Sequence, residues 1–216
     1  MSHFTHFLDI LVKDPDEIPH VIGLLVKAVH SWIRYEFDSD EVAGVRQEKV
    51  AIALPHARLS DGVDSRKPYP GDILRVFSVD SALLDKLLRY PTLLTLRELD
   101  AVVFSPINPL QATHIIGHQR WCRSRKPERQ TEAFRAREKR RNERRQHPGK
   151  VTMPGQEQPC PSLFIRTTST ETQKRFSLFI TVHDGDPACG TPGTFNSYGL
   201  IVGDGVGVPV LREDIV

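Results

Sequence analysis

The chain has 216 residues, which is enough for one large domain or two small ones, and its 39% hydrophobic and 26% charged residues are ordinary for a globular protein. No apolar run reaches the roughly 18 residues of a membrane span, and no basic segment precedes an apolar one at the start, so we expect neither a membrane segment nor a signal peptide. Cys122, Cys160 and Cys189 are scattered, without the CxxC spacing of a zinc site. Such cysteine usage argues against a disulfide framework and favours the cytoplasm.

The net charge of +2 conceals an uneven distribution. Residues 119–150 carry 13 Lys or Arg against 4 Glu, a local balance of +9, and the rest of the chain therefore sums to −7. A mildly acidic body with one concentrated basic segment is the electrostatic pattern of a protein that binds a polyanion.

The first half of the sequence alternates predicted strands and helices. Residues 4–12 have the alternating apolar pattern of a strand, and Asp14-Pro15-Asp16-Glu17 then breaks it ahead of an amphipathic helix that reaches Ile33. Further strands are predicted at 49–54, 73–79 and 99–104, with a polar loop at 58–71 and a short helix at 81–88. The order β-α-β-β-α-β predicts a ferredoxin-like (RRM-like) domain over residues 1–108.

The composition changes after Pro106-Ile107-Asn108-Pro109, and we place a domain boundary there. Residues 109–216 are predicted to form a second, α/β domain that binds nucleic acid. Its main feature is an arginine-rich helix at 127–146, opened by Pro127. Strands follow at 163–168 and 176–182, then a loop at 185–196 and apolar segments at 198–202 and 206–211. The predicted fold class is therefore α+β.

The arginine-rich helix places several guanidinium groups on one ridge. Arg137, Arg141 and Arg144 or Arg145 recur at helical spacing, with Arg140 beside them. Guanidinium groups suit bidentate contacts to phosphate and to guanine edges. The alternative, a solvated helix laced with ion pairs, has too few glutamates. The pattern predicts nucleic-acid binding without separating RNA from DNA, and the arginines that lead into the helix extend it: Arg120, Arg123, Arg125 and Arg129.

The pair His114 and His118 and the single residue His30 are the histidines that could form a site. His114 and His118 have a spacing that could share a metal on a helix, but no carboxylate lies near them in the sequence, so an incidental pair is the better interpretation. His30 lies near the end of the first helix, on the polar side of its apolar stripe. A histidine at a helix end is more often structural or solvent-exposed than a proton carrier. Ser-His-Asp, HExxH and glycine-rich phosphate motifs do not occur, and no cofactor or metal is predicted.

A series of short motifs resembles one known family in the same order along nearly the whole chain. They are His6-Phe7-Leu8-Asp9-Ile10 with the acidic turn after it, Val29-His30, Lys126-Pro127-Glu128-Arg129, residues 165–170 and 175–180, Asn196-Ser197-Tyr198-Gly199-Leu200, and Val208-Pro209-Val210. This arrangement resembles the CRISPR repeat-processing endoribonucleases of the type I-F kind, the Cas-six (Csy-four-like) family.

The resemblance makes residues 109–216 an RNA-binding domain that holds the repeat hairpin. It also implies metal-independent cleavage of this stem-loop at its 3′ base. A ribose 2′-OH attacks the neighbouring phosphate and leaves a cyclic phosphate. The resemblance makes His30 the acid or base and gives Tyr198 the task of orienting it or the RNA. The ribose-holding serine of the family corresponds to Thr167, with Ser169 as the nearby substitute, and Phe176 would stack on a base at the foot of the hairpin. The implied partners are the CRISPR repeat RNA and other subunits of an RNA-guided effector complex.

Besides Thr167, two positions depart from the family pattern. Arg120 matches a base-reading arginine, but Cys122 stands where the family has a glutamine, and Ala133 replaces an arginine in the basic helix. The alternative interpretation is a noncatalytic RNA- or DNA-binding structural subunit of a type I-F or type IV CRISPR particle. Thr167 in place of serine fits such a loss of cutting residues.

Overall fold

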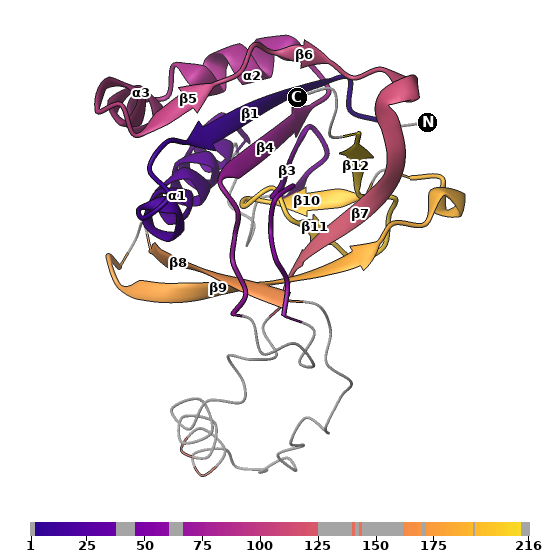
Figure 1. Ribbon diagram of the computed structural model, residues 1–216. Helices are drawn as coiled ribbons and strands as arrows, with labels where there is room; N and C mark the ends of the chain where they lie inside the picture. Colours follow the sequence, from indigo (N-terminus) through magenta and orange to yellow (C-terminus); the bar gives the residue numbers. More distant parts are fainter. Residues whose placement is uncertain are drawn as a thin grey trace.

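A computed structural model shows the arrangement of the chain (Figure 1) and describes residues 3–37, 46–60, 67–124, 140, 143, 162–169, 172–191 and 193–212. Two β-sheets and three α-helices make up most of the described chain, which confirms the predicted α+β class. None of the described helices has the length and apolar character needed to cross a membrane.

The first sheet is antiparallel and has the strand order β3-β4-β1-β5. Its strands are short and rich in Val, Ile, Leu and Phe, which pack well on a half-buried pleated surface. They are β1 (His6–Val12), β3 (Val50–Ala53), β4 (Ile73–Ser78) and β5 (Val102–Phe104), and β6 (Asn108–Pro109) also pairs with β1. The four strands predicted in this half are thus present.

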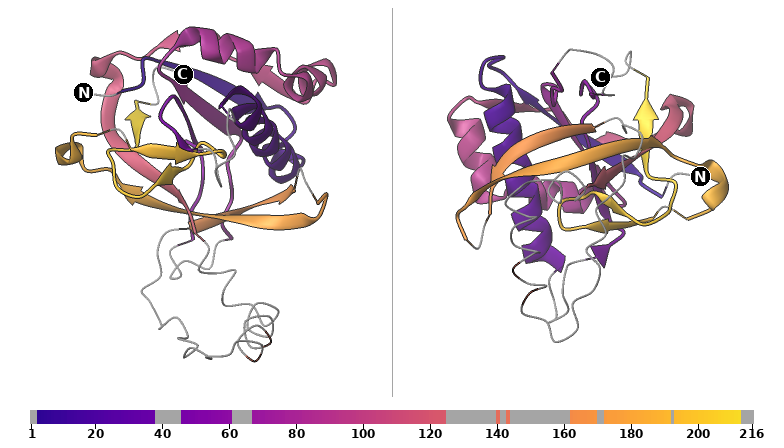
Figure 2. Two further views of the ribbon diagram at one scale, coloured as in Figure 1. Left: turned by 180° about the vertical axis from the view of Figure 1, so that it is seen from behind. Right: turned by 90° about the horizontal axis from the view of Figure 1, so that it is seen from below.

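The α-helices of the first half of the chain accompany this sheet (Figure 2). Helix α1 (Ile18–Phe37) buries the apolar stripe seen in the sequence, and α2 (Ser81–Leu88) is capped by the Asp80 side chain, which accepts a hydrogen bond from the Ala82 amide. Helix α3 (Pro91–Glu98) was missed by the sequence analysis. It begins with proline at its first turn and buries Leu93 and Leu96. Because α3 occupies residues up to 98, the strand expected at 99–104 begins only at Val102.

The second sheet has the order β2-β10-β11-β7-β9-β8, with β12 also on β7. The long strands are β7 (Ile115–Arg123), β8 (Ser162–Thr168) and β9 (Arg175–Asp184). The short ones are β2 (Arg46–Gln47), β10 (Thr194–Asn196), β11 (Ile201–Val202) and β12 (Val208–Leu211). Strand β7 was not predicted, and β10 lies inside the expected loop, so that loop prediction was wrong at its end. Short 3-10 turns occupy Ala112–His114 and Pro187–Cys189.

The two sheets are connected through α1 and β2. Strand β2 comes from the first half of the chain but pairs with β10, and buried residues of both halves form one hydrophobic cluster. Helix α1 meets β8 at Gly23, where an added Cβ would lie 2.1 Å from the Arg166 carbonyl oxygen. The glycine therefore allows the helix backbone to touch the strand. The domain boundary at residue 108 stays a prediction.

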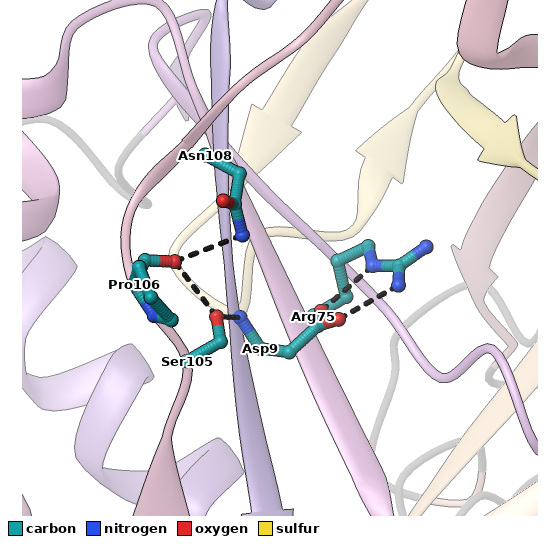
Figure 3. A network of polar contacts seen from close by, with 5 residues as sticks. All are labelled: Asp9, Arg75, Ser105, Pro106 and Asn108. Atoms are coloured by element: carbon teal, nitrogen blue, oxygen red, sulfur yellow. Dashed lines mark hydrogen bonds and ion pairs between the residues drawn. The ribbon is translucent and has the colours of Figure 1, made fainter. Parts of the chain in front are cut away.

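The first sheet contains a buried ion pair between neighbouring strands (Figure 3). The Arg75 guanidinium donates from Nε and Nη2 to the two Asp9 carboxylate oxygens, each at 2.7 Å, and both side chains are about 95% buried. Arg75 also lies over the Phe7 ring, with Cζ 5.0 Å from the ring centroid. The Ser105 hydroxyl accepts a hydrogen bond from the Asp9 amide and so connects the pair to the segment after β5. Both charges are satisfied inside the fold, as a buried pair requires.

Candidate active site

His30 and Tyr198 lie face to face although 168 positions separate them in the sequence. Their ring centroids are 4.0 Å apart and the ring planes differ by 6°. His30 comes from the second half of α1, and Tyr198 from the turn between β10 and β11. A parallel stack at this distance restricts the plane of the imidazole ring. A side chain that transfers a proton to or from one particular oxygen needs such a fixed orientation.

The turn that carries Tyr198 is held by its neighbours. The Asn196 side-chain oxygen accepts hydrogen bonds from the amides of Tyr198 (2.8 Å) and Leu200 (3.3 Å). Gly199 adopts a φ of +71°, and its carbonyl accepts from the Ile52 amide of the first sheet at 3.0 Å. A side chain there would press on Ile52, so glycine is required both for the backbone angle and for the close approach. The turn thus anchors Tyr198 to both sheets.

Arg123 brings a positive charge to the same place. It ends β7, and its guanidinium carbon lies 5.5 Å from the centroid of the Tyr198 ring. This is within the range of a cation–π contact. His30, Tyr198 and Arg123 therefore combine an imidazole that can accept or donate a proton, an aromatic ring that orients it, and a cation close by. Such a set can move a proton beside a phosphate and stabilise the charge that develops there.

Thr167 and Ser169 lie apart from this cluster. Thr167 is 8% exposed, and its Oγ1 donates to the Gly23 carbonyl at 3.1 Å. Gly23 precedes His30 by seven residues, which is about 10 Å along a helix. Along β9, the partner of Thr167 lies four residues from the partner of Arg123, which is about 14 Å in a strand. The Ser169 hydroxyl accepts a hydrogen bond from the Thr172 amide, in the turn beyond Thr167.

Phe176 pairs with Thr167 across the β8–β9 hairpin and is half-buried. It packs against the hydrophobic core with part of its ring and faces a groove with the rest. Its placement is compatible both with a packing role and with stacking on a base.

Of the predicted RNA-binding arginines, the structure describes Arg120, Arg123 and Arg140. The Arg120 guanidinium donates to the Gly203 carbonyl at 2.7 Å and to the Asp204 carboxylate at 3.2 Å, so it is tied to the glycine-rich turn before β12. Arg140 is helical and exposed. The other predicted members, like the helix at 127–146 as a whole, lie outside the described residues: Arg125, Arg129, Arg137, Arg141 and Arg144.

His114 and His118 do not share a helix face. His114 ends a 3-10 turn and His118 lies in β7, where burial lowers its pKa. Within the described part of the chain, no cluster of three or more His, Cys, Asp or Glu is arranged to hold a metal ion.

A groove of about 780 Å³ opens where the start of α1, the segment before β4 and the β8–β9 hairpin meet. Tyr69, Phe164 and Arg166 line it, and the sequence analysis assigned none of them to a site. The alternation of β8 could have revealed Phe164 and Arg166, since Ile165 and Thr167 are buried on the opposite face of the strand. Nothing local in the sequence brings Tyr69 to the same place.

One comparison with known protein families matches nearly the whole chain. The family model described as CRISPR-associated protein (Cas_Csy4) matches residues 7–210, from β1 to β12. The chain belongs to this family. A search among curated proteins found no match. Membership makes the protein a Csy4-like CRISPR endoribonuclease of the type I-F kind that processes CRISPR repeat RNA, as the order of its motifs indicated.

Proposed function

We propose that this protein cuts the repeat stem-loop at its 3′ base without a metal, by attack of a ribose 2′-OH on the adjacent phosphate, and that His30 carries the proton. The observation that supports this most directly is the parallel stack of His30 on Tyr198. An imidazole can transfer a proton to or from the reacting oxygen only if it points at that oxygen, and the stack restricts its plane.

The neighbouring groups take supporting roles in the proposal. Arg123, beside Tyr198, stabilises the additional negative charge of the phosphate as the new bond forms. The 2′-OH loses its proton as its oxygen bonds to phosphorus, and the departing 5′ oxygen gains one, so the reaction needs one group that accepts and one that donates. His30 serves at one of these two steps.

The substrate is proposed to be held by the arginine-rich segment and Phe176, and the product to stay bound within an effector complex with other CRISPR subunits. The strand order β3-β4-β1-β5 with α1 and α2 supports interpreting residues 1–108 as ferredoxin-like. We propose the cytoplasm as the location, on the cysteine usage of the sequence.

One observation favours the noncatalytic alternative. The Thr167 hydroxyl is buried and donates to the Gly23 carbonyl, so in this structure it holds α1 against β8. If the reaction needs that hydroxyl on the ribose, the protein would bind its hairpin without cutting it.

The decisive experiment compares His30→Ala with the unchanged protein on the repeat hairpin, in EDTA. General acid–base groups contribute about 10²–10⁴-fold to rate, so cleavage should fall by that factor. Hairpin affinity should change little, because phosphate contacts dominate it. A substrate with 2′-deoxyribose at the cut site should also resist the unchanged protein. Full cleavage by His30→Ala would refute the mechanism, and no cleavage by the unchanged protein would favour the structural subunit.

A further inference from the structure

The groove beside the β8–β9 hairpin has an unusual lining, because the chain outside residues 119–150 is acidic overall. Its described lining contains three aromatic rings and the cations Arg166 and Arg175, together with His20. None of the described lining residues is Asp or Glu. Outside residues 119–150 the net charge of the chain is −7. A groove whose described lining holds cations and no Asp or Glu therefore differs in charge from most of the remaining chain.

Tyr69 forms a rigid wall of the groove. Its amide and carbonyl both pair with Arg58, each at 2.8 Å, and Pro68 and Pro70 flank it. The Arg58 guanidinium lies over the ring, with Cζ 5.8 Å from the centroid. Partial burial and the carboxylate of Asp72 raise the pKa of Tyr69, so its hydroxyl stays protonated and neutral. A ring held in this way loses little conformational entropy when a flat ligand stacks on it.

Phe164 provides a second aromatic surface, on the exposed face of β8. The side chain is 40% exposed, a high value for a phenylalanine in a strand. The Arg166 guanidinium lies over its ring at 6.0 Å from the centroid, two residues along the same face. Aromatic rings interleaved with arginines form the surface on which single-stranded nucleic acids bind, since each base has a π-face and each linkage a charge.

We propose that this groove, defined by Tyr69, Phe164, Arg166, Arg175 and Phe176, binds the single-stranded RNA that flanks the repeat hairpin. The proposal rests on the proposed function and adds a binding site to it. The groove begins at Thr167 and Phe176, about 14 Å along β9 from the partner of Arg123. That distance corresponds to about four stacked nucleotides at the rise of a nucleic-acid strand. A strand leaving the hairpin at His30 and Tyr198 can therefore reach it.

The test uses the full chain and a short oligouridylate that cannot form a hairpin. The label is 4-thiouridine, which crosslinks to neighbouring side chains under light, and the crosslinked peptides are identified by mass spectrometry. We expect crosslinks to the peptides that contain Tyr69 and Phe164. Affinity is measured in parallel by fluorescence anisotropy. Loss of one stacking platform should weaken binding by about fivefold or more in Phe164→Ala and in Tyr69→Leu.

Matched controls are available on the same protein. Tyr35 is an exposed aromatic residue on α1. The Arg97 guanidinium lies 6.0 Å from the Phe104 ring centroid, the same distance as that between Arg166 and Phe164. Neither Tyr35 nor Arg97 lines the groove. Tyr35→Ala and Arg97→Ala should keep the affinity of the unchanged protein, whereas Arg166→Ala should lower it. Thermal melting of each variant identifies any that fail to fold.

Two results would overturn the proposal: crosslinks confined to residues outside the groove, or equal affinities for the folded groove variants and their controls. The outcome is separate from that of the cleavage test, because the probe has no hairpin and cleavage is not scored. Oligouridylate bound in the groove by a protein that cuts nothing would support this site while refuting the proposed reaction.

Discussion

The stack of Tyr198 on His30 can be tested by changing the ring and its hydroxyl separately. Tyr198→Leu removes the aromatic face and keeps an apolar side chain, and Tyr198→Phe keeps the face and removes only the hydroxyl. The geometry of the pair, 4.0 Å between parallel rings, assigns the ring an orienting role. We therefore expect the two variants to differ.

The magnitude follows from the energy of such a contact. An aromatic pair contributes about 0.5–1.5 kcal/mol beyond buried area, so its loss lets His30 leave the reactive orientation by a factor of about 2–13. Tyr198→Leu should slow cleavage by that factor, well short of the loss expected for His30→Ala. Tyr198→Phe should cut at nearly the unchanged rate. Loss of the Arg123 contact would add about 0.5–1 kcal/mol to the destabilisation of Tyr198→Leu.

Single-turnover cleavage with saturating protein measures the rate without interference from product release, and hairpin affinity and melting temperature are measured beside it. The reasoning is refuted if Tyr198→Phe is as slow as His30→Ala, because the hydroxyl would then take part in the chemistry. It is also refuted if Tyr198→Leu cuts at full rate while folded.

Three further predictions concern binding and stability. Changing Arg137, Arg140 and Arg141 to Ala should weaken hairpin binding and flatten its dependence on salt, because each lost phosphate contact releases one counterion fewer; an unchanged salt slope would exclude this segment as the main contact. Phe176→Ala should lower RNA affinity or cleavage more than thermal stability, whereas a lower melting temperature with unchanged affinity would assign the ring to the core. Arg75→Met should destabilise the fold by about 3–5 kcal/mol in denaturant titration, since it leaves Asp9 buried without its cation, and Arg75→Met with Asp9→Leu should recover part of the loss.

Periodicity alone predicted the strands and helices that bury a full apolar face. The stripe from Ile18 to Ile33 became α1, and the alternation at 163–168 became β8. The helix and the strand that the sequence did not predict have weaker apolar patterns. Helix α3 buries only Leu93 and Leu96 over eight residues, and β7 is mostly half-buried with Gly117 and polar residues among its members. Strands stabilised by their neighbours rather than by their own sequence cannot be recognised locally.

The same limit applies to the site. The resemblance identified His30 and Tyr198 separately, but their contact depends on the Asn196–Gly199 turn reaching Ile52 of the other sheet. Arg123 was predicted as an RNA contact, and only the strand pairing of β7 brings it beside Tyr198. The resemblance matches Thr167 to a serine, but the hydrogen bond from its hydroxyl to the Gly23 carbonyl depends on the packing of α1 on β8, which the local sequence does not reveal.

The ends of the second sheet are closed by the first part of the chain, and this bears on solubility. An open edge strand exposes unpaired amides and carbonyls to any other chain. At one end lies β8, where Gly23 of α1 sits against the Arg166 carbonyl and Ser60 pairs with Ser162 in both directions. At the other end, β2 adds a strand of two residues, too short to recruit a further strand. Residues 18–37 and 46–60 thus protect a sheet built mainly from later residues against edge-to-edge aggregation.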